Sequence, residues 1–484
     1  MENALVSYVP VIALLFVIGL VVYRLPKIDL GHSPAFLRRR FWNWLPLGLT
    51  YALLYMGRYN LTVSKNFLPQ GLMSKEDFGE IFAWGAVVYG LSFLVNGPLT
   101  DRIGGRATIL LAAAGSAVMN AALGIVVLLG WTDNIVVVFS VIYGLNMYFQ
   151  SFGAVSIVKV NAAWFHVRER GAFGGIFGIL ISLGIFLAFD VGRMIAEHTR
   201  VEWVFFAPAV LLSLFFVVSS VFVRNQPSDA GFDDFDTADA SSGDGNERLP
   251  VFAVMKKMFT NPVIITIALV EFCSGFLRNA IMHWYPIMAK ETGIQDTFVP
   301  KNWGMLLCCA GILGGMFAGQ ISDRVFQSRR GPVAGVLYAG MLVGALGVYF
   351  VLNSPLLGWL VVFMSLCVIG VHGMLSGTAS MDFGGKKNVG VAVGLIDGCV
   401  YLGTAAQSYV LGHVLPKGDA ANDPAQWTSW PMAMVPVAVL GLFLASRVWN
   451  ASPKPSSRGK SDPPPSVAAP VPPVDTRDAR AVTV

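Results

Sequence analysis

Apolar stretches of about twenty residues recur along almost the whole of this 484-residue chain. A helix of that length crosses a hydrocarbon core of ~30 Å, and in lipid only helices and closed barrels satisfy every backbone hydrogen bond. Charged residues make up 13% of the chain, whereas a soluble domain carries about a quarter. The sequence therefore predicts an all-α protein that crosses a membrane many times.

The apolar stretches form one early span, at about 7–24, followed by two sets of six. The two sets lie at about 42–64, 80–100, 107–130, 135–160, 170–195 and 203–223, and at about 262–289, 302–322, 333–352, 357–379, 389–414 and 430–450. We therefore expect five regions: an extra N-terminal transmembrane anchor at 1–30, a six-helix bundle at 42–223, a linker at 224–258, a second six-helix bundle at 259–450 and a tail at 451–484.

The segments outside the two sets differ in composition. Residues 225–248 are acidic and rich in Asp, Ser and Gly, which predicts a flexible linker. The tail contains PPP and VPP, which predicts a disordered tether. The first span has Glu2 in place of a basic leading region, and its basic residues follow the apolar run, so we expect an uncleaved anchor.

Lysine and arginine gather in alternate loops. One set of loops holds Arg24, Lys27, Arg38–Arg40, Arg102, Arg106, Arg168, Arg170, Lys256, Lys257, Arg324, Arg329, Arg330, Lys386 and Lys387. The opposite loops hold few basic residues. Because basic loops stay in the cytoplasm, we expect an external N-terminus and a cytoplasmic C-terminus.

Two arginines stand inside apolar runs, Arg58 in YALLYMGRYNLTV and Arg278 in VEFCSGFLRNAIMHWYP. A charge at membrane depth costs at least ~2.5–3.5 kcal/mol on insertion scales, so such residues usually face a cavity and have a function. If the spans start at Trp42 and Pro262, each arginine lies about sixteen residues into its span, so we expect the two at similar depth. A guanidinium fork binds phosphate or carboxylate. The alternative is an internal ion pair, and Glu271 lies seven residues before Arg278.

A loop motif repeats at the spacing of these arginines. Its residues are Gly97, Asp101, Arg102 and Arg106 after the third span, and Gly319, Asp323 and Arg324 after the ninth. The aspartates are 323 − 101 = 222 residues apart and the arginines 278 − 58 = 220. Two landmarks at one period predict two homologous halves with pseudo-twofold symmetry. We expect the glycines to allow close helix approach and the aspartates to make a contact with the facing half that forms in one conformation only.

Six plus six helices with these loops resemble the major facilitator superfamily over about residues 42–450. Five motifs in order resemble its organophosphate:phosphate antiporter family, which includes bacterial glycerol-3-phosphate and hexose-6-phosphate transporters. They are Tyr51-x-x-x-Tyr55-x-x-Arg58-x-Asn60, Phe149-Gln150-x-x-Gly153, Trp164-Phe165-x-x-Arg168-Glu169-Arg170-Gly171, Leu277-Arg278, and Met381-Asp382-Phe383-Gly384-Gly385-Lys386 with Gly398-x-x-Tyr401-Leu402-Gly403. In that family the positions of Arg58 and Arg278 clamp the phosphoryl group of the substrate. The resemblance implies a secondary transporter of the bacterial inner membrane that exchanges its substrate for inorganic phosphate.

Other polar residues are candidates for the same site. Contact with the substrate is expected from Tyr51, Tyr55, Asn60 and Gln150. Tyr55 is preferred because it lies three residues before Arg58, on the same helix face. Glu271 and Asp397 are the candidates for coupling protons or balancing the arginine charge.

Three positions depart from the glycerol-phosphate branch of the family. Tyr59 and Phe93 stand where that branch has lysine, and Leu180 where it has histidine. The expected cavity is therefore less basic, which favours a bulkier or less charged anion than glycerol 3-phosphate.

Two other functions stay open. Two arginines also bind carboxylates, so one alternative is a proton-coupled carboxylate transporter. One branch of the family senses hexose phosphate, so the other is a membrane sensor. The sequence has no Walker loop, no HExxH and no GxSxG elbow with plausible partners. We therefore expect that the protein is not an enzyme and that it uses no cofactor or metal. We expect a monomer in a lipid bilayer that binds no nucleic acid.

Overall fold

The computed structural model describes residues 30–450 apart from 70, 132, 167–168, 238–255, 257–258, 327–329 and 376–379, together with Phe16 and Tyr23. The side chains of 170–177, 323–324, 380–390 and 392–393 are not among those described. Apart from Phe16 and Tyr23, the expected anchor at 1–29 lies outside the described residues, and so does the tail at 451–484.

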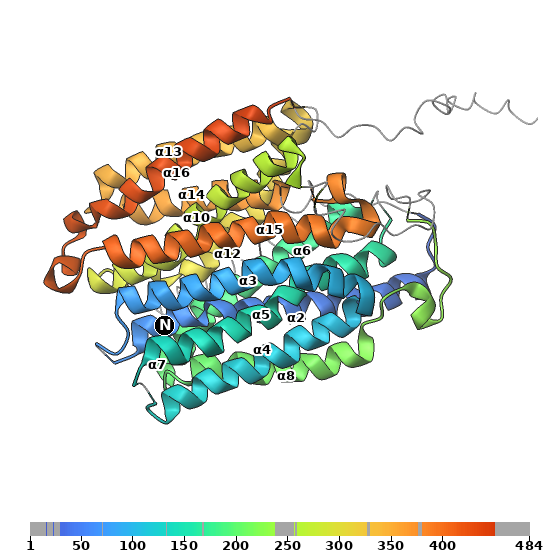
Figure 1. The fold of residues 1–484 in the computed structure, drawn as a ribbon, viewed down its shortest axis with the longest axis horizontal. Coiled ribbons are helices and arrows are strands. Elements are labelled where there is room, and N and C mark those ends of the chain that lie inside the picture. The colour runs from blue at the N-terminus through green and yellow to red at the C-terminus, as the bar shows by residue number, and fades with distance from the viewer. Residues whose placement is uncertain are drawn as a thin grey trace, which may run out of the picture. The chain divides into compact units, whose positions relative to one another are not determined.

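Within the described residues the chain forms twelve long helical segments (Figure 1). The first six are α2 (Pro34–Phe67), α3 (Lys75–Ile103), α4 (Gly105–Leu128), α5 (Ile135–Trp164), α6 (Arg170–Phe186) continued by η2 (Leu187–Val191) and α7 (Gly192–His198), and α8 (Trp203–Phe222). The second six are α10 (Pro262–Glu291), α12 (Trp303–Val325) preceded by the short α11 (Phe298–Lys301), α13 (Arg330–Val351), α14 (Leu356–Met374), α15 (Ser380–Val414) and α16 (Ser429–Arg447).

By length and composition, ten helices in the described part of the chain can cross a membrane. The two long helices not among these ten are α2 and α15, which carry Arg58 and Asp397. Polar residues inside these two helices lower their mean hydropathy, and the same residues are the ones expected at the site.

Each of the twelve expected core spans corresponds to one helical segment. Two helices, α2 and α15, begin well before their apolar stretches, at residues 34 and 380 and not at about 42 and 389. α2 begins at Pro34, where the side chain of Ser33 accepts a hydrogen bond from the backbone nitrogen of Phe36 and caps the helix. Arg58 is therefore 58 − 34 = 24 residues into its helix, whereas Arg278 is 278 − 262 = 16 residues into α10. The start assumed at Trp42 is therefore eight residues too late, and the similar depth expected of the two arginines stays a prediction.

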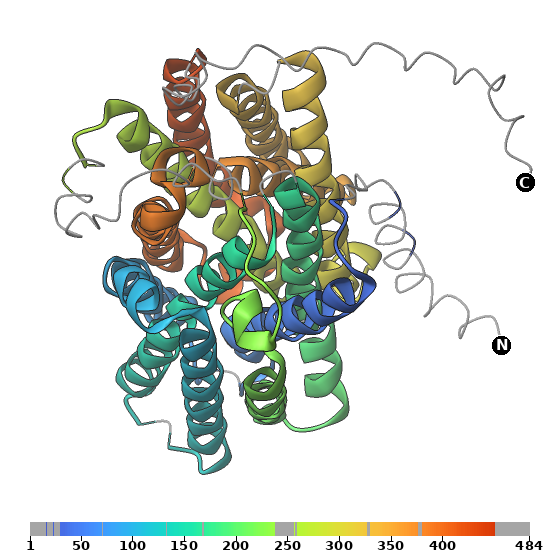
Figure 2. The same ribbon diagram turned by 90° about the vertical axis from the view of Figure 1, so that its right-hand side faces the viewer.

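The two sets of helices meet along α15, which packs against α3 of the first set and α10 of its own set. A second contact between the sets joins α6 and α12. After a 90° turn, the first set lies in the lower part of the picture and the second set mainly in the upper part (Figure 2). The centre of the molecule is thus lined by helices from both sets.

The crossing of α10 and α15 depends on two glycines. A Cβ atom on Gly275 would lie 1.9 Å from the carbonyl oxygen of Val400, and one on Gly403 would lie 2.0 Å from that of Phe272. Small residues allow such close approach of helices in membranes. This crossing fixes Arg278 on α10 beside the polar face of α15.

The start of the expected flexible linker at 224–258 is packed against the first helices. The backbone nitrogen of Arg224 donates to Oδ1 of Asn43 at 2.7 Å. The rings of Phe232 and Phe235 each lie 5.7 Å from the ring of Phe36. Residues 224–237, including η3 (Pro227–Ala230), are therefore ordered because their aromatic side chains bury against α2. Residues 238–255 lie outside the described residues.

Candidate functional site

Arg58 is fully buried on α2 and its guanidinium is held by three polar groups. Nε donates to Oε1 of Gln150 at 2.8 Å, Nη2 donates to the hydroxyl of Tyr89 at 2.8 Å, and Nη1 donates to the hydroxyl of Tyr401. The guanidinium also lies 4.6 Å from the ring centroid of Tyr55 and 4.4 Å from that of Tyr89. Because Tyr401 belongs to α15, this arginine joins the two sets of helices.

A further layer of hydrogen bonds fixes this arrangement. Nε2 of Gln150 donates to Oδ1 of Asn146 at 3.2 Å, and Nδ2 of Asn146 donates to the carbonyl of Gly57 at 2.9 Å. The hydroxyl of Tyr143 donates to the carbonyl of Arg58 at 3.1 Å. Packing and hydrogen bonds of this kind preorganise a binding group.

Arg278 is also buried, with 6% of its surface exposed, but its Nε and Nη2 have no hydrogen-bond partner among the described residues. A buried donor without a partner costs about 1–3 kcal/mol, and more when it is charged. Arg278 interacts electrostatically with Tyr55, Tyr59 and Tyr401, and Arg58 interacts with the same three tyrosines. The two arginines therefore share one cluster of tyrosines.

The two acids expected near the arginines lie close to this cluster. Glu271 is fully buried, its Oε2 lies 3.0 Å from Nδ1 of His372, and its Oε1 has no partner among the described residues. Asp397 is buried on α15 and interacts electrostatically with Glu271 and Tyr401. Glu271 thus forms its ion pair with His372 rather than with Arg278.

Of the residues expected to contact the substrate, some contact Arg58 and others do not. Gln150 and Tyr55 contact Arg58 directly, and the ring of Tyr51 lies one layer away, 5.2 Å from that of Tyr55. Asn60 is turned away, because its Nδ2 donates to Oδ1 of Asn120 at 2.7 Å and to the carbonyl of Val204 at 3.3 Å. Asn60 is therefore not among the residues around the arginines.

The hydrogen bond between Tyr401 and Arg58 is not predicted by the sequence. This residue lies 343 positions from Arg58 in the chain, so no local pattern joins the two. In the sequence it stands out only as part of a family motif. Tyr89, whose hydroxyl also binds the arginine, is a weaker candidate from sequence because a single tyrosine in a span is most often an interfacial or structural residue.

Aromatic and apolar residues occupy the three positions that depart from the glycerol-phosphate branch. The ring of Phe93 lies 4.9 Å from that of Tyr89, and the ring of Tyr59 lies 5.4 Å from that of His283. Leu180 is buried. The wall around the arginines is aromatic, as the sequence predicts for a less basic cavity.

Among the described side chains, Asp101 and Arg106 of the first loop motif contact residues of their own half. Oδ1 of Asp101 lies 2.7 Å from Nζ of Lys159 on α5, and Nη2 of Arg106 donates to the carbonyl of Ser220 at 2.8 Å. The expected contact of Asp101 with the facing half is not among these interactions. Among the described residues, no atom lies within 4 Å of a Cβ built on Gly319, so the close helix approach expected of this glycine stays a prediction. The side chains of Asp323 and Arg324 lie outside the described ones.

One end of the interface between the two sets is closed by direct contacts. We call it the outer end, because the basic loops predict it to be external. Here Oγ1 of Thr62 lies 2.6 Å from Nδ1 of His283, and Nδ2 of Asn66 donates to the carbonyl of Pro286 at 3.3 Å. Further contacts across the interface join Asp190 to the backbone nitrogens of Gly304 (2.6 Å) and Met305 (2.8 Å), Arg193 to Asp296 (2.9 Å), and Lys75 to Glu291.

Two six-helix sets that meet at a shared interface with one closed end have the architecture of a membrane transporter. The comparison with protein families agrees. Residues 47–408 match the family model described as Major Facilitator Superfamily. The chain belongs to the major facilitator superfamily, which confirms the fold expected from the repeat and the prediction that the chain is a transporter and not an enzyme.

Similar proteins narrow the branch of that superfamily. The glycerol-3-phosphate transporter of Bacillus subtilis (strain 168) is 27% identical over 438 residues, which cover 87% of this chain and 95% of that protein. The membrane sensor protein UhpC of Escherichia coli (strain K12) is 25% identical over 399 residues, 78% of this chain and 87% of that protein. A probable hexose phosphate transport protein of Chlamydia trachomatis serovar D is 22% identical over 450 residues, 87% and 94% of the two chains. These similarities confirm the resemblance to the organophosphate:phosphate antiporter family.

A solved structure shows the same fold. It is a bacterial homolog to the human lysosomal transporter Spinster, in an inward-facing and unoccupied conformation. The TM-score is 0.64 at 13% sequence identity, and the match covers 87% of this chain and 98% of that one. At this identity the likeness concerns the fold alone.

Proposed function

We propose that this protein carries a phosphorylated metabolite across the bacterial inner membrane by alternating access, with Arg58 and Arg278 holding the phosphoryl group between the two six-helix halves. Relatives named as glycerol-3-phosphate and hexose phosphate transporters support the substrate class. The observation that carries the proposal is Arg278, a buried guanidinium whose Nε and Nη2 have no partner among the described residues. A purely structural arginine in this position would be paired, because unpaired buried donors are costly.

The donors available to a ligand suit a phosphoryl group. A guanidinium has five N–H donors, and Arg58 uses one on each of its three nitrogens. Tyr59 also hydrogen-bonds Arg58, so at most two N–H groups of Arg58 remain, beside those on Nε and Nη2 of Arg278. Several donors from two sides match the three oxygens of a phosphate monoester. Tyr55, Tyr59 and Tyr401 lie between the arginines and present aromatic faces to the organic part of the substrate.

The closed outer end supports a mechanism for movement. In this conformation the halves are joined at the outer end, so we propose that the site is reached from the cytoplasm. Rocking of one half against the other then breaks the contacts of Thr62, Asn66 and Asp190 and opens the outer end. The same proposal places the N-terminus outside, the C-terminus in the cytoplasm and one complete carrier in each monomer.

Transport into proteoliposomes preloaded with inorganic phosphate tests the clamp. We expect uptake of labelled glycerol 3-phosphate or hexose 6-phosphate that depends on internal phosphate. Arg278→Lys keeps the charge but removes the fork, and a lost charge-assisted hydrogen bond of about 1.5–3 kcal/mol lowers kcat/KM by roughly 10–100-fold. Arg58→Lys should behave alike, whereas Arg447→Lys at the end of α16 should transport normally. Normal uptake by both the Arg58→Lys and the Arg278→Lys variants contradicts the clamp.

Proton coupling is the second candidate, and the Glu271–His372 pair favours it. A buried carboxylate with one oxygen unpartnered among the described residues, beside an imidazole and within electrostatic reach of Arg278 and Asp397, is built to gain or lose a proton. In vesicles without internal phosphate, uptake driven by a pH gradient and lost in Glu271→Gln indicates protons as the coupling ion. Competition between phosphate and organic acids then separates a phosphate carrier from a carboxylate carrier.

The similarity to UhpC keeps a sensor as a further candidate. A sensor binds its ligand with little flux and needs a signalling surface. The segment 1–30, which has no counterpart in the two six-helix sets, is the region to delete. Loss of signalling with binding retained indicates a sensor, and unchanged flux indicates a carrier.

A further inference from the structure

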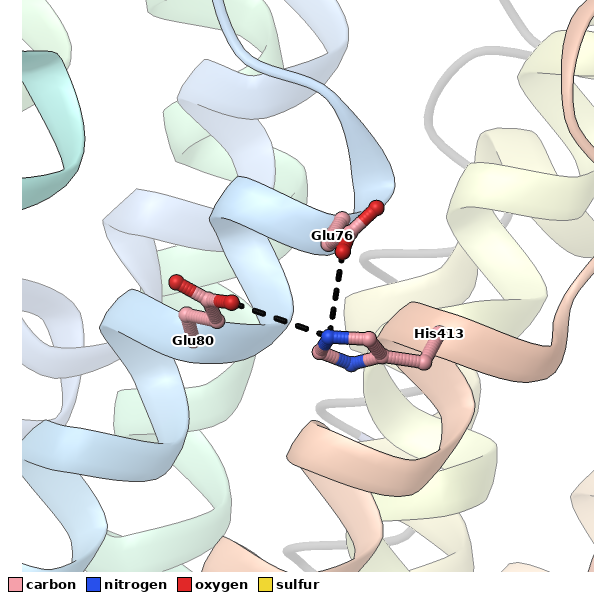
Figure 3. A group of neighbouring side chains, drawn as sticks. All are labelled: Glu76, Glu80 and His413. Atoms are coloured by element: carbon pink, nitrogen blue, oxygen red, sulfur yellow. Dashed lines mark ion pairs between the residues drawn. The ribbon is translucent and has the colours of Figure 1, made fainter.

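A histidine and two glutamates from opposite halves converge at the outer end (Figure 3). Glu76 and Glu80 lie one turn apart at the start of α3, and His413 lies in the last turn of α15. Nε2 of His413 is 3.1 Å from Oε1 of Glu76 and 3.6 Å from Oε1 of Glu80. One ligand atom from each residue lies within 4.8 Å of the other two. We propose that Glu76, Glu80 and His413 form an external site for a divalent transition-metal ion such as Zn²⁺, which ties the halves together and keeps the outer end closed.

The two distances from Nε2 of His413 to the carboxylate oxygens suit zinc. Bonds of about 2.0–2.1 Å in a tetrahedral site place neighbouring ligand atoms about 3.4 Å apart. The two separations from Nε2 of His413, 3.1 and 3.6 Å, lie on either side of that value. Residues at i and i+4 share one helix face, so both carboxylates of α3 reach the imidazole. A small inward rotation of either glutamate completes three corners of the tetrahedron, and the fourth faces solvent for a water ligand.

The hydrogen bonding of His413 leaves the correct nitrogen for a metal. Nδ1 lies 2.8 Å from the carbonyl oxygen of Tyr409, which only accepts hydrogen bonds, so Nδ1 carries a proton. Nε2 of the neutral ring is then an acceptor that faces two carboxylates. Such an arrangement is stabilised by a cation between the three groups, either a proton on Nε2 or a metal ion. Metal-binding histidines usually donate their other N–H to a carbonyl or carboxylate in this way.

The surroundings make the site accessible and tunable. The side chains of Glu76 and Glu80 are each 41% exposed and that of His413 is 31% exposed. Nζ of Lys417 lies 2.6 Å from Oε2 of Glu76, the oxygen that does not face the histidine. Its positive charge opposes a metal ion by direct repulsion. Removal of this charge should therefore strengthen metal binding, whereas removal of a ligand should weaken it.

A metal ion here acts on the conformation because α3 and α15 belong to different halves. The same end of α3 already joins the second half through the ion pair of Lys75 and Glu291. Outward opening must separate these groups, so a bound ion stabilises the closed outer end. The charged groups that surround Nε2 of His413 are Glu76 and Glu80, and Lys417 lies behind Glu76.

Metal binding to the purified full-length protein tests the site without any transport assay. Calorimetry with Zn²⁺ should give one site per chain, and Co²⁺ should give the visible absorption of a tetrahedral complex. His413→Gln and Glu80→Gln should each weaken Zn²⁺ binding by about 10-fold or more, and Lys417→Met should strengthen it. His198→Gln is the matched control, since Nδ1 of His198 also lies 2.9 Å from the carbonyl of the residue four positions earlier.

The outcomes separate this proposal from the proposed function. Zn²⁺ affinity unchanged in both His413→Gln and Glu80→Gln, with unfolding curves like the parent, overturns the metal site. Weaker binding in Lys417→Met overturns the geometry around Glu76. If binding behaves as expected, external Zn²⁺ should inhibit uptake by the parent and spare His413→Gln. Absence of any uptake by the parent would count against the transport proposal alone.

Discussion

At the scale of single residues, the two arginines that look equivalent in the sequence differ in the structure. Arg58 is held by Gln150, Tyr89 and Tyr401, whereas Arg278 keeps two nitrogens unpartnered among the described residues. A preorganised arginine and a less occupied one share the tyrosines between them. We therefore expect the substrate to engage Arg278 first and then to compete for Arg58.

Sequence spacing predicted part of this arrangement. Residues three or seven positions from Arg58 share its helix face, which is why Tyr55 lies against Arg58 and Tyr51 lies edge-on to Tyr55. Asn60 is two positions away, about 200° around the helix at 3.6 residues per turn, and it faces Asn120 instead. Helix geometry alone therefore argues against Asn60, whereas Tyr401 comes from the other half and required the structure.

Tyr401→Phe and Tyr89→Phe form a matched pair that tests the bridge between the halves. Each removes one acceptor from Arg58 and leaves a buried donor unpaired, at a cost of about 1–3 kcal/mol. We expect both to lower thermal stability, because both hydroxyls bind the guanidinium. Only Tyr401 lies in the opposite half, so only Tyr401→Phe should favour the open outer end.

The measurement for this pair is the labelling rate of a cysteine at Asn66 by a membrane-impermeant maleimide. Asn66 is covered at the outer end through its bond to the carbonyl of Pro286. Faster labelling in Tyr401→Phe than in Tyr89→Phe is the expected result. Equal rates in the two backgrounds contradict the assignment of Tyr401 as a bridge.

At the scale of helices, close crossing at glycines fixes the second half. Gly275→Ala and Gly403→Ala each place a methyl group within 2.0 Å of a carbonyl oxygen on the partner helix. Overpacking of this kind typically costs about 1–3 kcal/mol. We expect a lower unfolding midpoint in detergent for both, measured by intrinsic fluorescence. Gly319→Ala, where a Cβ meets no atom of the described residues within 4 Å, is the control and should unfold like the parent.

The π-helical turn around Asp190 is a feature that the pattern of apolar residues does not predict. The span expected at 170–195 is one helical segment, but residues 187–191 form a π-helical turn that brings Asp190 to the N-terminus of α12. Apolar stretches show that a span exists, and a local change in helical pitch leaves no mark in them. The reason for this turn is the long-range contact, which spans 114 residues.

Asp190→Asn tests the contact with α12. A carboxylate at a helix N-terminus contributes about 0.3–1 kcal/mol, and up to ~2 kcal/mol when partly buried. Loss of the charge should favour the open outer end and speed labelling of a cysteine at Asn66 by roughly 2–30-fold. Glu202→Gln is the control, because Glu202 pairs with Arg200 within the first half. A labelling rate equal to that of the control counts against a role for Asp190 in closing the outer end.

At the scale of the whole molecule, the repeat of the loop motifs predicted two halves but did not predict which end is closed. One sequence must stabilise both conformations of a carrier, so its patterns are compatible with each. Asp101 illustrates this point, because it pairs with Lys159 in its own half in the conformation observed. Contacts that alternate between states have to be read from a structure of each state.

Covalent linkage of the halves at the outer end should stop transport, because rocking requires that this end opens. Lys75 and Glu291 form an ion pair between the halves, so Lys75→Cys with Glu291→Cys is the pair to join with a short, reducible thiol-specific cross-linker. We expect uptake to fall to the level of empty vesicles and to recover after reduction. The control pair, Arg200→Cys with Glu202→Cys, replaces an ion pair of 2.7 Å within the first half. Its cross-linking should leave uptake intact, since no contact between the halves is fixed. Continued uptake by the fully cross-linked Lys75→Cys, Glu291→Cys protein contradicts alternating access through the outer end.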